Sequence, residues 1–385
     1  MEKISEFDDI RPYCDDEIAP VINRLLKNSQ FREGMDYLFQ EKNWEQIEKF
    51  MRTLTTQYGF QRLFSDIANE LLTRSANGVT KSGLESISKT GAYTYISNHR
   101  DIVWDATLLG TRLLGIDYET VENAIGDNLL LTEWIKDLAR LNKCFIVKRS
   151  VSGRQIYEAS VHLSKYIHFT IKEKNQSIWI AQREGRAKDS NDRTQESVLK
   201  MLAMGGDKNF LNSLLELNLT PLTFSYEYDP CDYLKAKEFQ QRRDNPDFKK
   251  AREDDLLSMK TGLLGYKGKI HLQIGRPVNP DLLKLDDSLN KNELVVLAAS
   301  IIDKEIFRNY KFFPINYIAY DRLWGKDFFR EKYTDDDVKN VERYFQQQMD
   351  KIDLPTGKDV TFLMGKIEEM YAYPVRNNCE LVVNG

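Results

Sequence analysis

The sequence predicts an α/β fold: a mixed sheet flanked by helices, with a helical region before it and helical elements after it. Up to about residue 75, apolar residues recur three and four positions apart, which is the spacing of amphipathic helices. Beyond that point short apolar runs alternate with helical segments, and helical spacing alone returns near residue 286. We therefore expect a helical N-terminal region (1–75), an α/β domain (76–285) and a mainly helical C-terminal region (286–385).

Composition narrows the class of protein. With 385 residues, of which 41% are hydrophobic, the chain can bury a large core. Its net charge of −4 gives no reason to expect nucleic acid as a partner. The cysteines stand far apart, without a CxxC pair, which is typical of reduced thiols in a cytoplasmic protein and argues against a zinc site. They are Cys14, Cys144, Cys231 and Cys379.

The helices of the two outer regions follow from apolar spacing. In the N-terminal region we predict helices over 16–26, 44–54 and 60–72, with a break at 75–78. In the C-terminal region we predict helices over 289–307, 338–349 and 359–371, and a short strand over 379–383.

In the α/β domain, five short apolar runs bounded by polar or turn residues are predicted strands: 92–96, 143–149, 178–181, 219–227 and 269–275. Helices are predicted over 102–114, 129–141, 154–172 and 194–204. The charged run 240–255 is predicted to be a solvated helix or loop.

His99 is the first candidate for chemistry, because it directly follows the predicted strand 92–96 and has two carboxylates nearby, Asp101 and Asp105. A histidine whose ring is held by an acid can take a proton from a hydroxyl. Asp101 is also well placed to cap the helix that follows, a purely structural role.

Two basic segments follow later strands. Lys148 and Arg149 end the second strand, where a planar guanidinium and a mobile ammonium suit a phosphate group. Residues 183–186 form a polar Arg-Glu-Gly-Arg turn after the third strand, where glycine lets the backbone approach a ligand closely. Ser82 and Ser97 do not lie in a GxSxG motif, and no glycine-rich nucleotide loop is present.

Taken in order, the blocks 97–105, 143–149, 178–186 and 219–227 resemble the glycerolipid acyltransferases, which acylate glycerol-phosphate and lysophosphatidic acid. The resemblance covers about residues 75–280. The segments 10–13 and 309–316 are also similar to a longer bacterial subgroup of that family.

The resemblance implies an O-acyltransferase of phospholipid synthesis, with the family's α/β fold, that moves a fatty acyl group from acyl-CoA or acyl carrier protein to a glycerol-phosphate-type acceptor. It implies that His99 is the base. The family has its acid at the position of Trp104 here, so Asp105 matches that acid, and orients His99, if the turn after His99 carries one extra residue. Asp101 is the alternative partner of His99. The resemblance also implies a set of residues that bind the phosphate and glycerol of the acceptor: Lys148, Arg149, Arg183, Glu184, Gly185 and Arg186. No permanently bound cofactor is implied.

Partners and location follow from this substrate class. The charged start of the chain lacks a signal-peptide core, and no run approaches the ~20 apolar residues that span a bilayer. We therefore expect a cytoplasmic enzyme that meets its lipid acceptor at the membrane surface, peripherally on the inner face. Candidate membrane contacts are 129–135 and 263–266. An acidic carrier protein fits a basic face made of Lys143, Lys148, Arg149, Arg154, Arg183 and Arg186.

Two alternatives remain at this stage. One is an acyltransferase for a lyso-aminolipid or another acceptor without phosphate. The other is a non-catalytic lipid-binding protein with the same fold.

Overall fold

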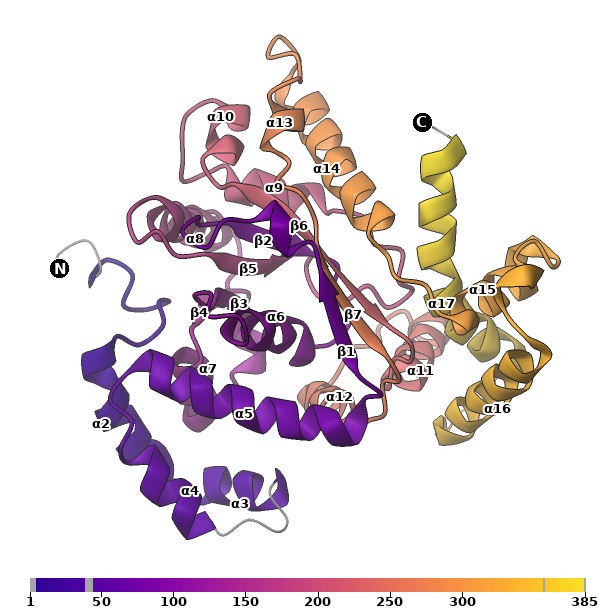
Figure 1. Cartoon of the computed structure of the whole chain (residues 1–385), viewed down its shortest axis with the longest axis horizontal. Coiled ribbons are helices and arrows are strands. Elements are labelled where there is room, and N and C mark those ends of the chain that lie inside the picture. Colours follow the sequence, from indigo (N-terminus) through magenta and orange to yellow (C-terminus); the bar gives the residue numbers. More distant parts are fainter. Residues whose placement is uncertain (1–4, 39–43, 356, 384–385) are drawn as a thin grey trace.

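The computed structural model describes residues 5–38, 44–355 and 357–383, and its centre is a seven-stranded sheet (Figure 1). The strand order is β1-β7-β6-β2-β5-β3-β4, and every neighbouring pair is parallel except β6 and β7. The strands are β1 (Val79–Ser82), β2 (Thr94–Ser97), β3 (Glu122–Gly126), β4 (Cys144–Val147), β5 (Ile178–Ala181), β6 (Leu219–Tyr226) and β7 (Ile270–Ile274). This mixed sheet flanked by helices confirms the predicted fold class.

Helices cover both faces of the sheet, because successive strand residues point to opposite sides. Tyr95 and Trp179 enter one apolar core, and Ile96 and Ile180 enter the other. The first core is covered by α5 (Gln57–Ser75), α6 (Trp104–Leu114) and α12 (Arg252–Leu264). The second is covered by α8 (Arg154–Lys172), α9 (Glu196–Leu202), α10 (Phe210–Leu215), α13 (Asn279–Leu282) and α14 (Lys291–Arg308) (Figure 1).

Two further apolar cores lie beyond the sheet. The N-terminal core involves α2 (Asp15–Leu26), α3 (Ser29–Leu38), α4 (Trp44–Met51), α5 and α7 (Glu133–Leu141). The C-terminal core involves α11 (Asp232–Asp244), α15 (Pro314–Tyr320), α16 (Asp335–Lys351) and α17 (Val360–Val383). Short single-turn segments occur at Leu84–Ser86, Asp127–Leu129, Asp321–Gly325 and Arg330–Lys332. Among the helices that the structure describes, none is long and apolar enough to cross a membrane.

The structure corrects several predicted elements. The strand predicted over 379–383 is wrong, because this apolar run is the last part of α17. Packing along the helix outweighs local strand propensity there: Leu363, Ile367 and Tyr371 are buried at helical spacing upstream, and the helix continues from them. Some elements were not predicted: strands β1 and β3 and helices α3, α10, α11, α12, α13 and α15. The charged run 240–255 contains the end of α11 and the start of α12. Part of the charged chain start, residues 1–4, lies outside the described residues.

The direction of the strands positions the candidate site. Since β2, β3, β4, β5 and β6 run parallel, their carboxyl ends meet at the same edge of the sheet. The loops that follow β2, β4 and β5 carry the residues predicted from the sequence. In open α/β sheets this edge is the usual place for a ligand site.

Candidate active site

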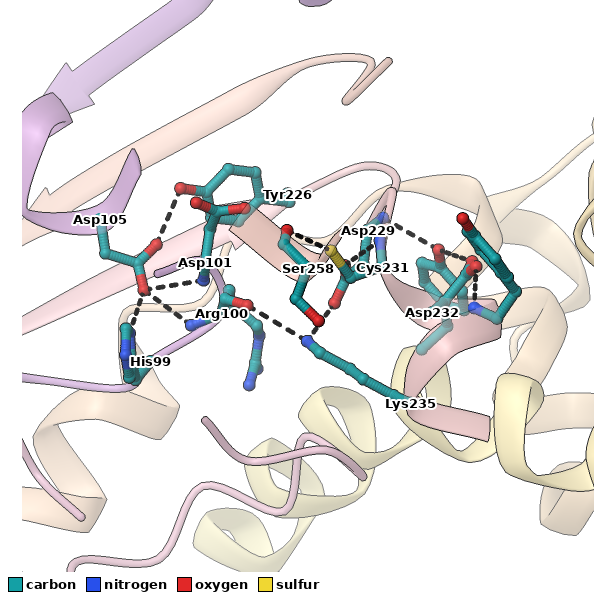
Figure 2. Close-up of polar contacts among 12 residues, drawn as sticks. His99, Arg100, Asp101, Asp105, Tyr226, Asp229, Cys231, Asp232, Lys235 and Ser258 are labelled. Carbon is teal, nitrogen blue, oxygen red and sulfur yellow. Dashed lines mark hydrogen bonds and ion pairs between the residues drawn. The ribbon is translucent and has the colours of Figure 1, made fainter. Parts of the chain in front are cut away.

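His99 lies in the loop between β2 and α6, and Asp105 lies in the first turn of α6. His99 Nδ1 is 2.8 Å from Asp105 Oδ2 (Figure 2). The Asp105 side chain is fully buried, whereas His99 is 13% exposed. A carboxylate bonded to Nδ1 keeps the proton on that nitrogen and leaves Nε2 as the acceptor, which is the arrangement of a histidine base.

The Asp105 carboxylate is saturated with donors. Oδ2 also accepts from the backbone N–H groups of Arg100 (2.7 Å) and Asp101 (3.1 Å), and Oδ1 accepts from the hydroxyl of Tyr226 at the end of β6 (2.8 Å). Burial and the nearby Asp105 charge raise the pKa of Tyr226 well above its ordinary value, so it stays a donor. Four donors hold the carboxylate in one orientation toward His99.

Asp101 has a different set of partners. Its Oδ1 accepts from the backbone N–H groups of Val103 and Trp104, both at 2.8 Å, which caps the start of α6. Burial raises the pKa of Asp101, and repulsion from the Asp105 charge is the second, smaller cause. Of the two carboxylates considered for His99, the structure therefore pairs the histidine with Asp105.

Arg100 ties this loop to the one after β5. Its guanidinium forms a bidentate ion pair with Asp192, which is fully buried. The hydroxyl of Tyr310 donates to the same carboxylate at 2.6 Å. Asn98 pairs with the backbone of Phe224 through both its amide oxygen and its amide nitrogen. The contacts of Asn98 and Arg100 therefore fix the residues directly before and after His99.

A pocket of about 570 Å³ opens beside His99 at this edge of the sheet. Apolar side chains from β3, the single-turn segment Asp127–Leu129, β4, α8 and α9 form much of its wall. They are Ile125, Leu129, Val147, Ile156, Leu163, Val198 and Met201, among others. The predicted binding residues also line it: Lys148, Arg149, Arg183, Glu184, Gly185 and Arg186. One pocket thus joins a histidine, an apolar wall and a cationic end.

The two cations after β4 differ in their surroundings. Asp127, directly after β3, accepts from the backbone N–H groups of Arg149 (3.0 Å) and Ser150 (3.3 Å), which shapes this loop. The Arg149 guanidinium is exposed and has no ion-pair partner among the described residues. Lys148 instead forms an ion pair with Asp9 of the N-terminal region. Arg149 is therefore the more available of the two for an anionic ligand.

The turn after β5 is built on Gly185, whose φ of +90° is a conformation that favours glycine. The backbone N–H of Glu184 donates to Gln195 Oε1 at 2.9 Å, while its carboxylate is exposed. Arg183 donates to the Asn191 carbonyl at 3.4 Å. In Arg186, one buried guanidinium nitrogen, Nη1, has no hydrogen-bond partner in the described chain. That orphaned donor sits beside the pocket.

The basic face predicted for a carrier protein needs one correction. Lys143 is buried, and its ammonium pairs with Glu119 at 3.4 Å and Gln176 at 3.1 Å, so it does not contribute to a surface. It directly precedes β4, at the opposite end of this strand from Lys148 and Arg149. Arg154 is exposed and pairs with Glu158 on its own helix.

One group of potential metal ligands, Cys14, Asp16 and Glu17, occurs among the residues that the structure describes. Glu17 already pairs with Arg11 at 2.6 Å and accepts from the backbone N–H of Cys14. Burial raises the pKa of the Cys14 thiol, which disfavours the thiolate that binds metals. None of these residues lines the pocket.

Several residues of the site were not found from the sequence, namely Tyr226, Asp192, Tyr310 and Asp127. Their partners lie far away in the chain, so no local motif signals them.

Comparison with known proteins gives a distant likeness at the level of structure. No known family model matches the chain, and a search of curated proteins finds no match. Among solved structures, the crystal structure of the 1-acyl-sn-glycerophosphate (LPA) acyltransferase PlsC from Thermotoga maritima is similar, with 12% sequence identity and a TM-score of 0.38. The match covers 80% of this chain and 97% of that one. So loose a likeness assigns no activity.

Proposed function

We propose that the chain is an O-acyltransferase of phospholipid synthesis, which moves a fatty acyl group from acyl-CoA or acyl carrier protein to a hydroxyl of glycerol-3-phosphate or lysophosphatidic acid. The observation that carries this proposal is the combination of groups in one pocket. His99, held by Asp105, shares the pocket with a long apolar wall and with the cations Arg149, Arg183 and Arg186.

His99 supplies the proton transfers. Nε2 takes the proton of the acceptor hydroxyl as its oxygen attacks the carbonyl carbon of the thioester. The tetrahedral intermediate then collapses, the C–S bond breaks, and the imidazolium returns the proton to the departing sulfur. The products are an ester and a free thiol. Asp105 stabilises the transient positive charge on His99 and does not itself exchange a proton.

The rest of the pocket matches the two ends of the substrates. The apolar wall accepts an acyl chain, and each methylene buried there contributes about 0.8 kcal/mol. The guanidinium of Arg149 is suited to bidentate contact with the phosphate of the acceptor, and Lys148, Arg183 and Arg186 add positive charge. The exposed carboxylate of Glu184 accepts from a glycerol hydroxyl, and Gly185 lets the backbone approach it.

Since lysophosphatidic acid and the acylated products are lipids, we propose that the protein works peripherally on the inner face of the cell membrane. Two segments were predicted to contact lipid. In 263–266, Leu264 and Tyr266 are exposed, at 40% and 55%. In the other, Trp134 packs against Phe31, with ring centroids 6.0 Å apart, and Leu129 lines the pocket. The segment around Leu264 and Tyr266 is thus the better candidate for membrane contact. For a carrier-protein donor, the docking cations that remain are Lys148, Arg149, Arg154, Arg183 and Arg186.

The test is release of free thiol by the purified native protein. Acyl-CoA and acyl carrier protein are offered as donors, each with glycerol-3-phosphate, lysophosphatidic acid or a lyso-aminolipid as acceptor. We expect release that depends on a phosphate-containing acceptor. Release that depends only on the lyso-aminolipid would replace the proposed acceptor, and release with no pairing would favour a lipid-binding role.

A further inference from the structure

The backbone of Arg100, the residue after His99, is held by a buried polar network that reaches the C-terminal helices. The backbone N–H of Arg100 donates to Asp105, as described above. Its carbonyl oxygen accepts from the ammonium of Lys235 at 3.1 Å (Figure 2). No other donor to this carbonyl occurs in the described parts of the chain. Arg100 is thus fixed at its amide, its carbonyl and its guanidinium.

Lys235 comes from the first turns of α11, and its side chain is 2% exposed. Its ammonium also pairs with Asp229, in the loop between β6 and α11. Asp229 Oδ1 accepts from the backbone N–H of Cys231 at 2.8 Å. Burial by itself would raise the pKa of Asp229, but the ion pair with Lys235 outweighs burial and holds the pKa below its ordinary value. The carboxylate therefore stays charged and anchors the lysine.

The C-terminal helices fix the start of α11. Asp232, which is fully buried, accepts from the hydroxyls of Tyr344 and Tyr371, both at 2.7 Å, and from the side-chain amide of Gln348. The hydroxyl of Tyr371 also accepts from the backbone N–H of Asp229 at 2.9 Å. Tyr344 and Gln348 belong to α16, and Tyr371 belongs to α17. Both ends of the Asp229–Lys235 pair are therefore tied to the C-terminal core.

We propose that Lys235 is a positioning residue for His99, and that α16 and α17 act on the site through it. This inference rests on the proposed function, because the placement of His99 matters for catalysis only if His99 is the base. Without Lys235, the buried Arg100 carbonyl loses its donor, and the peptide rotates to find another. The same peptide unit carries the N–H of Asp101, which donates to Asp105 Oδ2 at 3.1 Å. The rotation therefore moves this donor away from Asp105 and loosens the carboxylate that orients His99.

A spectroscopic experiment tests the positioning directly. A histidine N–H that donates to a buried carboxylate gives a proton resonance far downfield, and this signal does not require turnover. In protein labelled with ¹⁵N-histidine, the Nδ1–H signal of His99 is assigned by its loss in His99→Gln. We expect Lys235→Met to shift or broaden this signal, and Lys235→Arg to retain it, because arginine can still donate to both partners.

Two further variants separate positioning from general damage. Lys237→Met removes the same charge from the same helix, at a residue outside the network, and should leave the signal unchanged. If Lys235→Met does not fold, Asp229→Asn/Lys235→Met removes both charges and leaves only the Arg100 carbonyl without its donor. A lower melting temperature with an unchanged His99 signal, in whichever of these variants folds, would show a merely structural lysine and overturn the proposal.

Kinetics then connect the network to turnover. In Lys235→Met we expect kcat to fall on the order of 10–100-fold, with KM for donor and acceptor unchanged, because misplacing a catalytic group slows the chemical step. Lys235→Arg should recover most of that loss. If the native protein shows no acyl transfer while the His99 signal still depends on Lys235, the proposed function fails and the positioning stands.

Discussion

At the scale of single residues, the site is defined by which hydrogen bonds are already made. All the donors around Asp105 converge on its two oxygens, so its carboxylate has one orientation and faces His99. In contrast, Arg149 has its backbone fixed by Asp127 while its guanidinium stays unpaired in the described chain. The first arrangement suits a group that orients a base, and the second suits a group that awaits a ligand.

Asp105→Asn should lower kcat about 10²–10⁴-fold, the range that positioned acid–base groups contribute. The amide places an N–H2 group among four donors, so it rotates away from them or favours the wrong tautomer of His99. The measurement is steady-state thiol release. Tyr226→Phe is the matched control, because it removes only one of the four donors, and we expect it to retain activity within about tenfold. Equal losses in the two variants would contradict the orienting role of Asp105.

Arg149→Ala should raise KM for a phosphate-containing acceptor by about 10–100-fold, because a hydrogen bond to a charged group contributes about 1.5–3 kcal/mol. Any residual activity toward a lyso-aminolipid, which lacks the phosphate, should change little. Arg154→Ala is the control, since Arg154 is equally cationic, lies just beyond the same loop and pairs with Glu158. The phosphate-binding assignment is wrong if both acceptors lose affinity equally.

At the scale of elements, α12 packs against the loop that carries His99 and against the start of α6. The indole N–H of Trp104 donates to the carbonyl of Gly262 at 3.1 Å. A Cβ atom on Gly262 would lie only 2.0 Å from Asp101 Oδ2, so the absence of a side chain there lets the two elements meet. Because Asp101 caps α6, this contact links α12 to the geometry of the Asp105 turn.

Gly262→Ala should therefore destabilise the protein by about 1–3 kcal/mol, the usual effect of overpacking. It should also reduce turnover, because the capping carboxylate must move. Denaturant unfolding gives the free energy of unfolding. Gly365→Ala on α17 is the matched control: nothing lies within 4 Å of its added Cβ, and alanine should stabilise that helix by about 0.5–1 kcal/mol. A Gly262→Ala protein as stable as the native one would show that α12 is not tightly seated.

At the scale of the whole molecule, a buried acid joins the sheet domain to the C-terminal helices. Burial, and to a smaller extent repulsion from the Asp229 charge, raises the pKa of Asp232 to about 7. An acid whose pKa is higher in the folded than in the unfolded state contributes full stability below its unfolded pKa, near 3.8. That contribution is lost as the pH rises through about 7.

Between pH 5 and 7, Asp232 should therefore make the native protein less stable by about 1 kcal/mol per pH unit. Asp232→Asn should show a flatter dependence over the same range, since an amide does not titrate. The measurement is the difference in free energy of unfolding between the two proteins at pH 5, 6, 7 and 8. A constant difference across this range would contradict the assigned titration.

The sequence could predict the fold class and many of the residues that line the pocket, because both depend on short motifs that follow one another in a fixed order along the chain. His99, Arg149 and Glu184 each follow the end of a strand. Because these strands are parallel members of one sheet, the three residues come together at the same edge. Strands β1 and β3 were missed because they are short and partly polar, with no apolar run to mark them. The network from Asp105 to Tyr226, and from Arg100 to Lys235, joins residues 121 and 135 positions apart. Only the packed fold brings such partners together.

The most direct test of the central claim, that His99 is the base of an acyl transfer, compares thiol release by the native protein and by His99→Ala. His162→Ala is the control, since His162 also contacts an aspartate, Asp9, but does not line the pocket. We predict acceptor-dependent release by the native protein and by His162→Ala, and a loss of at least about 10²-fold in His99→Ala. Release by His99→Ala at the native rate would contradict the claim.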